Sequence, residues 1–574
     1  PADPYALTPL EREVMERMVL EFAHSEKLQR HVQFLYSAGG MYLRCNGNLL
    51  YHGCIPMEKN GDFAWLMHIL KSLKSTGKAA VILPHGVLFR GNAEAAIRKS
   101  IVDKGYIKGI IGLPANLFYG TGIPACIIVI DKSDADERNG IFMIDASHDF
   151  VKDGNKNRLR ERDIHKIVTT FNAQITDDAK YARFVPNDEI KIKNEYNLNI
   201  PRYIDSSVPE DLQDIDAHLH GGIPACDVDS MQNYWSVFKK LKNKLFSVIR
   251  DGYYQLNVNI SYVRNTIYND EEFSEYADKI DNAFEAWQND VDERLRNIKS
   301  NIDVKKFIVW LSEKLIEKFE DIELVDKYDI YEVLLSYWQE VMADDVFLIK
   351  YDGYEAGKEV ENIVETTENK KGEKKEKIRG WEGKLIPKAI IEKVFFAEER
   401  KKIDDAQAIV DETQNRLDEF VEENTGDDGV LGEYLNDKDA IDTKAVNAKL
   451  KELKKTTQDS EEYKILLTYT ELSAKVKEYT KIVKELHIAL DEAEKAKYVE
   501  LTIEEVKELL VNHKWYYTIF DGISELYLAT SHNMASRISE LANRYEVTLP
   551  SLEKEVEKYE AKVKSHLERM GFSW

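Results

Sequence analysis

A histidine and an arginine follow a short apolar run in the string LPHGVLFRG, where their side chains could contact a ligand. His85 and Arg90 come after residues 79–83, which are apolar and short enough to form a buried strand. Open α/β sheets bind ligands beyond the carboxyl ends of their parallel strands, so both residues are candidates for lining a site. For a single histidine, a hydrogen bond to the backbone of its own loop is an equally good explanation.

A glycine-containing string, Phe118–Gly122, has the F-x-G-x-G spacing by which many methyltransferases hold S-adenosylmethionine. A cofactor loop of this kind leaves a strand and opens a helix, because its glycines must admit close backbone approach. Here Ile123 and Pro124 lead directly into the apolar run 125–130. We therefore predict that this string is not the cofactor loop, and no other segment supplies one.

The string Asp3-Pro4-Tyr5 has part of the D/N-P-P-Y/F tetrapeptide that amino-methyltransferases place around the reacting amine. The sequence contains no Pro-Pro and no Asn-Pro dipeptide, so the tetrapeptide is incomplete. We interpret Asp3-Pro4 as a turn before a helix.

Basic side chains gather in one segment that could contact phosphate: Lys152, Lys156, Arg158, Arg160 and Arg162. A solvated helix start is the commoner meaning of such a run. The formal charge of −24 argues against broad, sequence-independent DNA binding by the whole surface, since neutralising phosphates requires Lys and Arg. Local contacts to DNA remain compatible with that charge.

Helices and strands alternate in the region that must position these residues. We predict helices at 62–76 and 92–103 and strands at 79–83, 107–113, 127–130 and 140–144. This order indicates a parallel sheet, and the short connection between the later strands suggests an antiparallel edge. Before it, we predict a helix at 6–33 and a hairpin around Asn46-Gly47, a pair that accepts the positive φ angles of a tight turn.

The second half of the chain has helical periodicity almost throughout. Residues 351–384 include NKKGEKKEKIRG and predict a charged linker, while 390–424, 460–497 and 550–570 combine spaced apolar residues with dense Glu and Lys. The fold class is α/β with a partial Rossmann-like sheet, followed by a large all-α region with a long helical hairpin or coiled-coil tail. Whether this tail packs on itself or on a partner stays open.

Composition places the chain among large water-soluble proteins. A length of 574 residues exceeds what one core supports, about 250–300 residues, so several domains are expected. Four cysteines without CxxC spacing favour a reducing cytoplasm over a disulfide framework. No apolar run approaches the roughly 18 residues of a membrane span, so we expect no membrane partner.

From about residue 60 onward, the chain resembles the type I restriction-modification methyltransferase (M) subunit, an adenine-N6 DNA methyltransferase family. The strings that carry this resemblance include NGDFAWLMHILKSLKSTGKAAVILPHGVLFRGNAE, GYIKGIIGLPANLFYGTGIPACIIVIDK, KNRLRERDIHKIV and the closing LERMGFSW. It implies methyl transfer from S-adenosylmethionine to adenine N6 of a flipped-out base in duplex DNA. It also implies assembly with a specificity (S) subunit, contacted by the helical tail, and a restriction (R) subunit.

For single residues, the resemblance implies that Phe118 stacks on the flipped adenine and that the neighbouring Tyr119 lines the site. A core-packing role for Phe118 is the alternative. Because the cofactor loop and the tetrapeptide are missing, we expect this chain alone neither to hold S-adenosylmethionine nor to methylate DNA.

Residues 1–56 instead resemble a stretch of class III fructose-1,6-bisphosphatase, through strings such as ALTPLEREVMERMVLEFAHSEKLQRHVQFLYSAGG. That resemblance makes His52 a metal ligand, although the other elements of a two-metal centre are absent. The switch near residues 55–62 suggests a hybrid reading frame, a join or a chimera. The expected segments are 1–56, 60–220, 225–350, the linker 351–384 and the tail 385–574. Alternative functions are a helical module that binds a specificity subunit and a phosphatase fragment.

Overall fold

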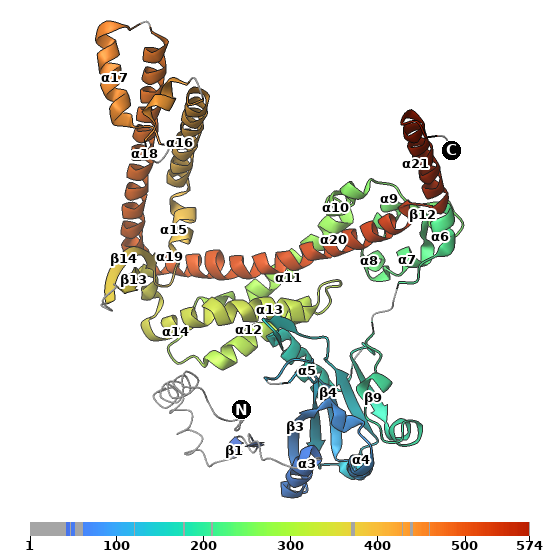
Figure 1. Ribbon diagram of the computed structural model, residues 1–574. Coiled ribbons are helices and arrows are strands. Elements are labelled where there is room, and N and C mark those ends of the chain that lie inside the picture. Colours follow the sequence, from blue (N-terminus) through green and yellow to red (C-terminus); the bar gives the residue numbers. More distant parts are fainter. Residues whose placement is uncertain are drawn as a thin grey trace, which may run out of the picture. The chain divides into compact units, whose positions relative to one another are not determined.

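The chain forms two compact units, residues 1–213 and 214–574. The computed structural model describes residues 42–45, 48–51, 61–119, 121–175, 178–207, 211–368, 374–426, 429–436, 440–458 and 460–572 (Figure 1). The predicted helix at 6–33, the turn residues Asn46-Gly47 and His52 lie outside these residues.

The N-terminal unit is built on a mixed five-stranded sheet with the order β3-β5-β4-β6-β9. Its strands are β3 (Lys78–Pro84), β4 (Ile107–Gly112), β5 (Ala125–Asp131), β6 (Gly140–Asp145) and β9 (Ala182–Pro186). Strand β5 is antiparallel to both β3 and β4, and β4 is parallel to β6, so β3, β4 and β6 run the same way.

The predicted strands are confirmed, but the antiparallel strand that follows the short connection, β5, does not lie at the edge of the sheet. Strand β5 lies inside the sheet, and the antiparallel edge strand is β9, which pairs with β6. The reason is that β5 is apolar on both faces: Cys126 and Ile128 belong to one core cluster, while Ile127 and Val129 pack against the other. A strand with two apolar faces is stable in the interior, where both faces are covered.

Helices cover the two faces of this sheet. Side chains of α3 (Gly61–Ser72) and α4 (Asn92–Asp103) join one core cluster, and α5 (Glu161–Ala173) contributes Ile167 to the other. The predicted helices at 62–76 and 92–103 are therefore confirmed. A short hairpin, β7 (Val151–Asp153) and β8 (Lys156–Arg158), precedes α5, and the predicted N-terminal hairpin is present as β1 (Tyr42–Cys45) and β2 (Asn48–Tyr51).

The C-terminal unit is mostly helical, as the periodicity predicts. Its helices are α6 (Ile215–His220), α7 (Ala225–Asp229), α8 (Gln232–Val237), α9 (Leu241–Leu245), α10 (Val263–Tyr268), α11 (Glu271–Leu295), α12 (Val304–Phe319), α13 (Lys327–Tyr337), α14 (Ala343–Asp352), α15 (Lys388–Phe395), α16 (Ala397–Asn424), α17 (Thr443–Thr456), α18 (Glu461–Glu500), α19 (Ile503–Glu508), α20 (Tyr517–Glu546) and α21 (Leu549–Arg569). A π-helical segment, η9 (Leu509–Tyr516), joins α19 to α20.

Two sheets in this unit were not predicted. Residues 351–384, expected to be a linker, contain the antiparallel hairpin of β13 (Val360–Glu368) and β14 (Lys374–Gly383). Tertiary contacts explain its formation, since Trp381 of β14 is buried and donates a hydrogen bond to Asp491 of α18 at 2.7 Å. A smaller sheet orders β10 (Ile223–Pro224), β12 (Tyr253–Leu256) and β11 (Phe246–Arg250).

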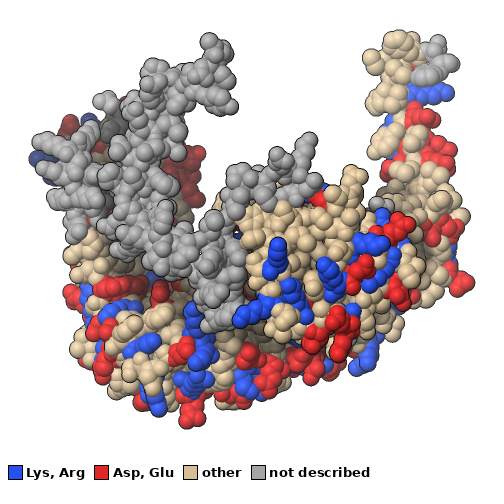
Figure 2. Space-filling view, turned by 90° about the horizontal axis from the view of Figure 1, so that it is seen from below, with Lys and Arg blue, Asp and Glu red and all other residues tan. Residues whose placement is uncertain are grey.

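Charge is distributed evenly over the face of the molecule shown in Figure 2. Lys and Arg side chains are interspersed with Asp and Glu among the described residues, and no broad basic surface is visible there. This agrees with the net charge of −24, which leaves basic residues in the minority.

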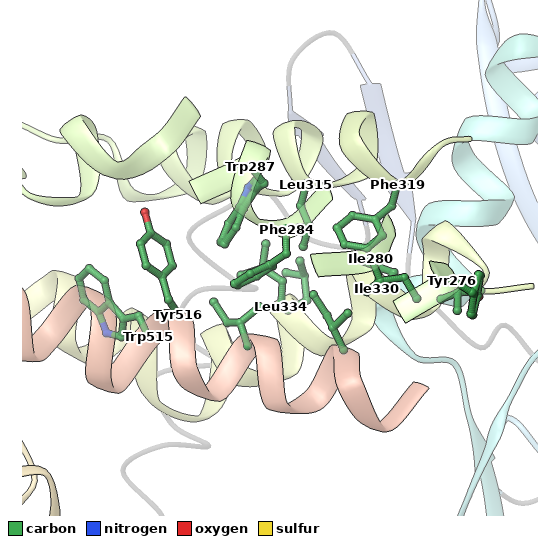
Figure 3. Close-up of a cluster of buried hydrophobic side chains, with 14 of the residues drawn as sticks. Tyr276, Ile280, Phe284, Trp287, Leu315, Phe319, Ile330, Leu334, Trp515 and Tyr516 are labelled. Carbon is green, nitrogen blue, oxygen red and sulfur yellow. The ribbon is translucent and has the colours of Figure 1, made fainter. Parts of the chain in front are cut away.

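Aromatic side chains fill the core of the C-terminal unit (Figure 3). Phe284 and Trp287 of α11 meet at 5.2 Å between ring centroids, and Tyr516 of η9 packs on both rings. The indole N–H of Trp287 donates to the Leu311 carbonyl at 3.2 Å, so this buried polar group is satisfied.

The long tail helices behave in two ways. Helices α16 and α18 pack side by side as an intramolecular hairpin (Figure 1). Helix α21 contacts α6 at its base but buries none of its residues.

Candidate functional site

The carboxyl ends of β3, β4 and β6 meet at one edge of the sheet in the N-terminal unit. Pro84 and Gly112 pair with Ala125 and Cys126 of β5, and Gly112 is level with Asp145 of β6. The loops that leave these three strands therefore converge on one region, as the sequence pattern predicts for a ligand site.

His85 follows β3 at this edge, and one of its ring nitrogens is buried without a hydrogen-bond partner among the described residues. Its backbone N–H donates to the Pro124 carbonyl at 3.0 Å, and its ring meets Phe89 edge to face at 6.4 Å. Its Nε2 atom is buried and has no hydrogen-bond partner among the described residues. Burial lowers the pKa of His85, while the carboxylate of Asp145 opposes that shift. A neutral imidazole can donate or accept one hydrogen bond from a ligand.

Asp145 is a site residue that the sequence analysis did not single out. It is buried at the end of β6, accepts a hydrogen bond from Ser206 Oγ at 2.7 Å and accepts another from the Ser147 backbone N–H at 3.1 Å. The signal that was present is an aspartate closing the apolar strand IFMID. The serine partner lies far along the chain, so only the fold brings it there.

The loop between β4 and β5 carries Phe118 and is held by the β7–β8 hairpin. Lys156 Nζ donates to the Phe118 carbonyl at 2.9 Å and to the Thr121 carbonyl at 3.4 Å. Asn157 Nδ2 donates to the Ala115 carbonyl at 2.7 Å. Phe118 retains 36% exposure, and Tyr119 is 94% exposed.

Arg90 is engaged within the chain instead of facing an open site. Its guanidinium donates to Asp62 at 2.9 Å and lies 3.5 Å from Glu94. The hydrogen bond to Asp62 raises the pKa of Arg90.

A second arginine fills the turn from β3 into α4. Arg98 donates to the carbonyls of Val87 and Arg90, and a Cβ added at Gly86 would lie 2.6 Å from Arg90 Nε. The backbone carbonyls of this turn are therefore already occupied and the space beside Gly86 is filled. The space beside Gly86 is therefore closed to a ligand, whereas the space beside Gly91, at the start of α4, is open.

The basic segment divides among separate tasks. Arg158 pairs with Asp153 at 3.7 Å. At the start of α5, Asp163 accepts hydrogen bonds from the backbone N–H of Arg160 at 2.8 Å and from its guanidinium at 3.0 Å. Lys156 clamps the Phe118 loop, as described above, and Lys152 is exposed on β7. These side chains serve local structure first, in line with the solvated helix-start interpretation.

Within the described part of the chain, no group of three His, Cys, Asp or Glu side chains is placed to hold a metal ion. Among the helices described, none is long and apolar enough to cross a membrane.

The comparisons with known proteins fall on the same unit. Residues 45–211 match the family model of the N-6 DNA methylases, and residues 1–82 match that of the Firmicute fructose-1,6-bisphosphatases. Both resemblances predicted from the sequence strings are thereby confirmed. The two matches overlap over residues 45–82, a wider zone than the expected switch at 55–62.

Curated relatives are of the same two kinds. The type I restriction enzyme MpnII methylase subunit of Mycoplasma pneumoniae is 33% identical over 199 residues, 35% of this chain and 34% of that protein. The MjaVII methylase subunit of Methanocaldococcus jannaschii is 37% identical over 173 residues, 29% of each protein. The class 3 fructose-1,6-bisphosphatase of Lacticaseibacillus casei is 51% identical over 78 residues, 14% of this chain and 12% of that protein. The chain thus spans about a third of the length of these two methylase subunits.

Among solved structures, a type I restriction-modification methyltransferase subunit from Streptococcus thermophilus is similar at 42% identity. It covers 27% of this chain and 32% of its own, with a TM-score of 0.25.

Proposed function

We propose that this chain is a partial M subunit of a type I restriction-modification system, whose complete form is an S-adenosylmethionine-dependent adenine-N6 DNA methyltransferase. The single observation that carries this proposal is the N-6 DNA methylase match, which covers the whole described sheet of the N-terminal unit. The identity of 33% to a type I methylase subunit supports it.

Within this proposal, the β4–β5 loop receives the target base. Phe118 offers an exposed aromatic ring for stacking, and the Lys156 and Asn157 hydrogen bonds to the loop backbone fix its position. The partly buried His85, whose buried Nε2 atom has no partner among the described residues, supplies one hydrogen-bonding group at the same edge. Lys152 and Arg158 are both exposed, and Arg158 pairs with Asp153, so Lys152 is the residue of the segment that we propose for a phosphate contact.

The chain alone is proposed to be inactive. In the turn from β3 into α4, Arg90 closes the space beside Gly86 and Arg98 occupies the carbonyls of Val87 and Arg90, which argues against a cofactor cradle beside Gly86. S-adenosylmethionine supplies the methyl group in the complete family members, and nothing in the described turn is arranged to hold it.

The test is isothermal calorimetry of the purified chain with S-adenosylmethionine, together with transfer of labelled methyl groups to duplex DNA in the presence of a specificity subunit. We expect neither binding nor transfer. Micromolar uptake of the cofactor or adenine methylation would contradict the proposed inactivity. Whether the inactive chain still assembles as an M subunit is tested separately, by co-purification with the specificity and restriction subunits.

A second candidate function is that of an interaction module, in which the helical tail binds a specificity subunit. Two observations favour it: α16 and α18 form a long hairpin, and α21, later in the chain, buries none of its residues. Co-purification of the chain with a specificity subunit, lost on deletion of 386–574 and kept on substitution of Phe118 by Ala, would support this function. Retention after the deletion would refute it.

A further inference from the structure

Helix α17 carries three lysines on the side that faces away from its packing partner. Lys444 and Lys451 are seven residues apart and Lys455 follows four residues later, so all three lie on one side of the helix. Val446 and Leu453, each two residues from one of these lysines, are buried on the opposite side, where α17 packs on α18. The three lysines, which we call the lysine row, are all exposed.

The charge of α17 is opposite to that of the chain as a whole. The chain carries −24, whereas the helix sequence TKAVNAKLKELKKT contains five Lys and one Glu and so carries +4. Lys449, outside the row, pairs with that Glu452 at 3.6 Å, and Asp442 caps the start of the helix. The lysine row makes no ion pair with any residue that the structure describes. Its three charges are therefore available to a partner.

The composition of this side of α17 favours a polyanion over a protein or a membrane. Ala448 lies between the lysines, and no large apolar side chain of α17 is exposed. The core of a protein interface is apolar or aromatic and depleted in lysine. A helix that lies in a membrane surface inserts apolar side chains. A nucleic-acid backbone, in contrast, is bound by cations without an apolar core.

The length of the lysine row fits several phosphates. Eleven residues of helix separate Lys444 from Lys455, a rise of about 16 Å. One strand of duplex DNA presents a phosphate about every 3.4 Å along its axis, so about five phosphates lie along the row. Lysine binds phosphate as a point charge on a flexible stem, so an exact match of spacing is not required. Up to three phosphates can be neutralised in this way.

The position of α17 separates this surface from the candidate site. Helix α17 lies between the end of α16 and the start of α18, at one end of their hairpin (Figure 1). It belongs to the C-terminal unit, whereas Phe118 and Lys152 belong to the N-terminal unit. A contact made by the lysine row is therefore additional to any contact made at the sheet.

We propose that the lysine row of α17 binds the phosphate backbone of duplex DNA without reading its sequence. The choice of DNA as the nucleic acid rests on the proposed function. The contact itself requires neither cofactor nor a flipped base, because phosphate contacts carry no direct sequence information.

The experiment is fluorescence anisotropy of the full chain with a labelled duplex of arbitrary sequence, between about 50 and 200 mM salt. The triple variant Lys444→Gln, Lys451→Gln and Lys455→Gln removes the row and keeps the helix propensity nearly unchanged. We expect it to weaken duplex binding more than about 10-fold and to lower the slope of log K against log salt by about 2–3. Its melting temperature should not change, because the three side chains are exposed.

A matched control removes the same charge elsewhere in the C-terminal unit. Lys554, Lys558 and Lys562 of α21 are exposed and alternate with Glu, so no cationic row forms there. Replacing these three by Gln gives the same net charge as the row variant and should change duplex binding by less than about 2-fold.

Four results would overturn the proposal. The chain does not bind the duplex at about 50 mM salt, the row variant binds as tightly as the unsubstituted chain, or the control variant is weakened equally. The fourth is that the row binds phosphatidylserine vesicles or polyglutamate as tightly as the duplex. None of these results concerns cofactor uptake or co-purification with a specificity subunit, so a failure here is distinguishable from a failure of the proposed function.

Discussion

The buried ion pair between Asp345 of α14 and Lys514 of η9 offers the sharpest test of the C-terminal core. Lys514 Nζ donates to Asp345 at 2.8 Å and to the Leu385 carbonyl at 2.7 Å, and the Trp515 indole N–H donates to the same carboxylate at 2.9 Å. The side chains of Lys514 and Asp345 are only 10% and 8% exposed. Burial raises the pKa of Asp345, and the hydrogen bonds and charge of Lys514 oppose that shift.

Replacing Asp345 by Asn keeps the shape and removes the charge. Asp345 offers one oxygen to each of its two donors, whereas the amide keeps only one oxygen, so Lys514 or Trp515 loses its hydrogen bond to residue 345. Lys514 keeps the Leu385 carbonyl, but its ammonium group stays buried without a counter-charge. We expect a loss of about 3–5 kcal/mol in the free energy of unfolding, with no cavity contribution. The double variant Asp345→Leu with Lys514→Met should cost much less, because neither charge remains.

Replacing Lys514 alone by Met should give a pH-dependent loss. Without the lysine, the pKa of Asp345 rises further above its unfolded value of about 3.9. A carboxyl group with a raised folded pKa binds more protons when folded, so stability falls as the pH rises through that pKa. Lys514→Met should therefore be less stable at about pH 8 than at about pH 5, relative to the unsubstituted chain.

Because the chain has two units, the measurement should be local. Hydrogen exchange of peptides from α14 and η9 in increasing urea reports this core, and peptides from the five-stranded sheet are the internal control. A loss below about 1 kcal/mol for Asp345→Asn would refute the reasoning, as would a pH-independent loss for Lys514→Met.

Three smaller predictions concern single contacts. Lys156→Ala should speed hydrogen exchange in the loop around Phe118 with little change in melting temperature, and unchanged exchange would contradict the clamp. Glu505 accepts a hydrogen bond from the Thr502 backbone N–H, and this bond together with Lys497 lowers the pKa of Glu505 to about 2. Glu505→Gln should therefore lower the free energy of unfolding by about 0.5 kcal/mol after solvent screening. In denaturant titrations of the unsubstituted chain, this contribution of Glu505 should disappear as the pH falls from about 4.3 to about 2. Burial raises the pKa of Cys126 to about 12, so mass spectrometry after alkylation of the folded chain should find exposed Cys226 modified first, and equal labelling would contradict this.

Local pattern was enough to predict most helices and strands. The strands at β3, β4, β5 and β6 were predicted because each is a short apolar run between turn residues. The tail helices were predicted because their apolar residues recur at helical spacing over long stretches. These signals involve neighbours within a few residues, so they survive without knowledge of the fold.

Side-chain contacts between segments far apart in the sequence could not be predicted from local pattern. The sequence placed Arg90 beside a site, whereas Asp62 of α3 and Glu94 of α4 hold its guanidinium. The sequence made Lys156 a candidate for contacting phosphate, whereas in the β7–β8 hairpin its side chain donates a hydrogen bond to the Phe118 carbonyl. Phosphate and a backbone carbonyl attract an ammonium group for the same reason, so residue type alone could not choose between them.

The sequence by itself determined most of the helices, the strands β3 to β6, the family resemblance and the helical spacing of the apolar residues in α21. Only the tertiary structure decided that β5 lies between β3 and β4, that 360–383 forms a hairpin and that the apolar residues of α21 are not buried. Burial is the reason: whether an apolar side chain is covered depends on which distant element packs on it, and the folded chain is the first state in which that element is present.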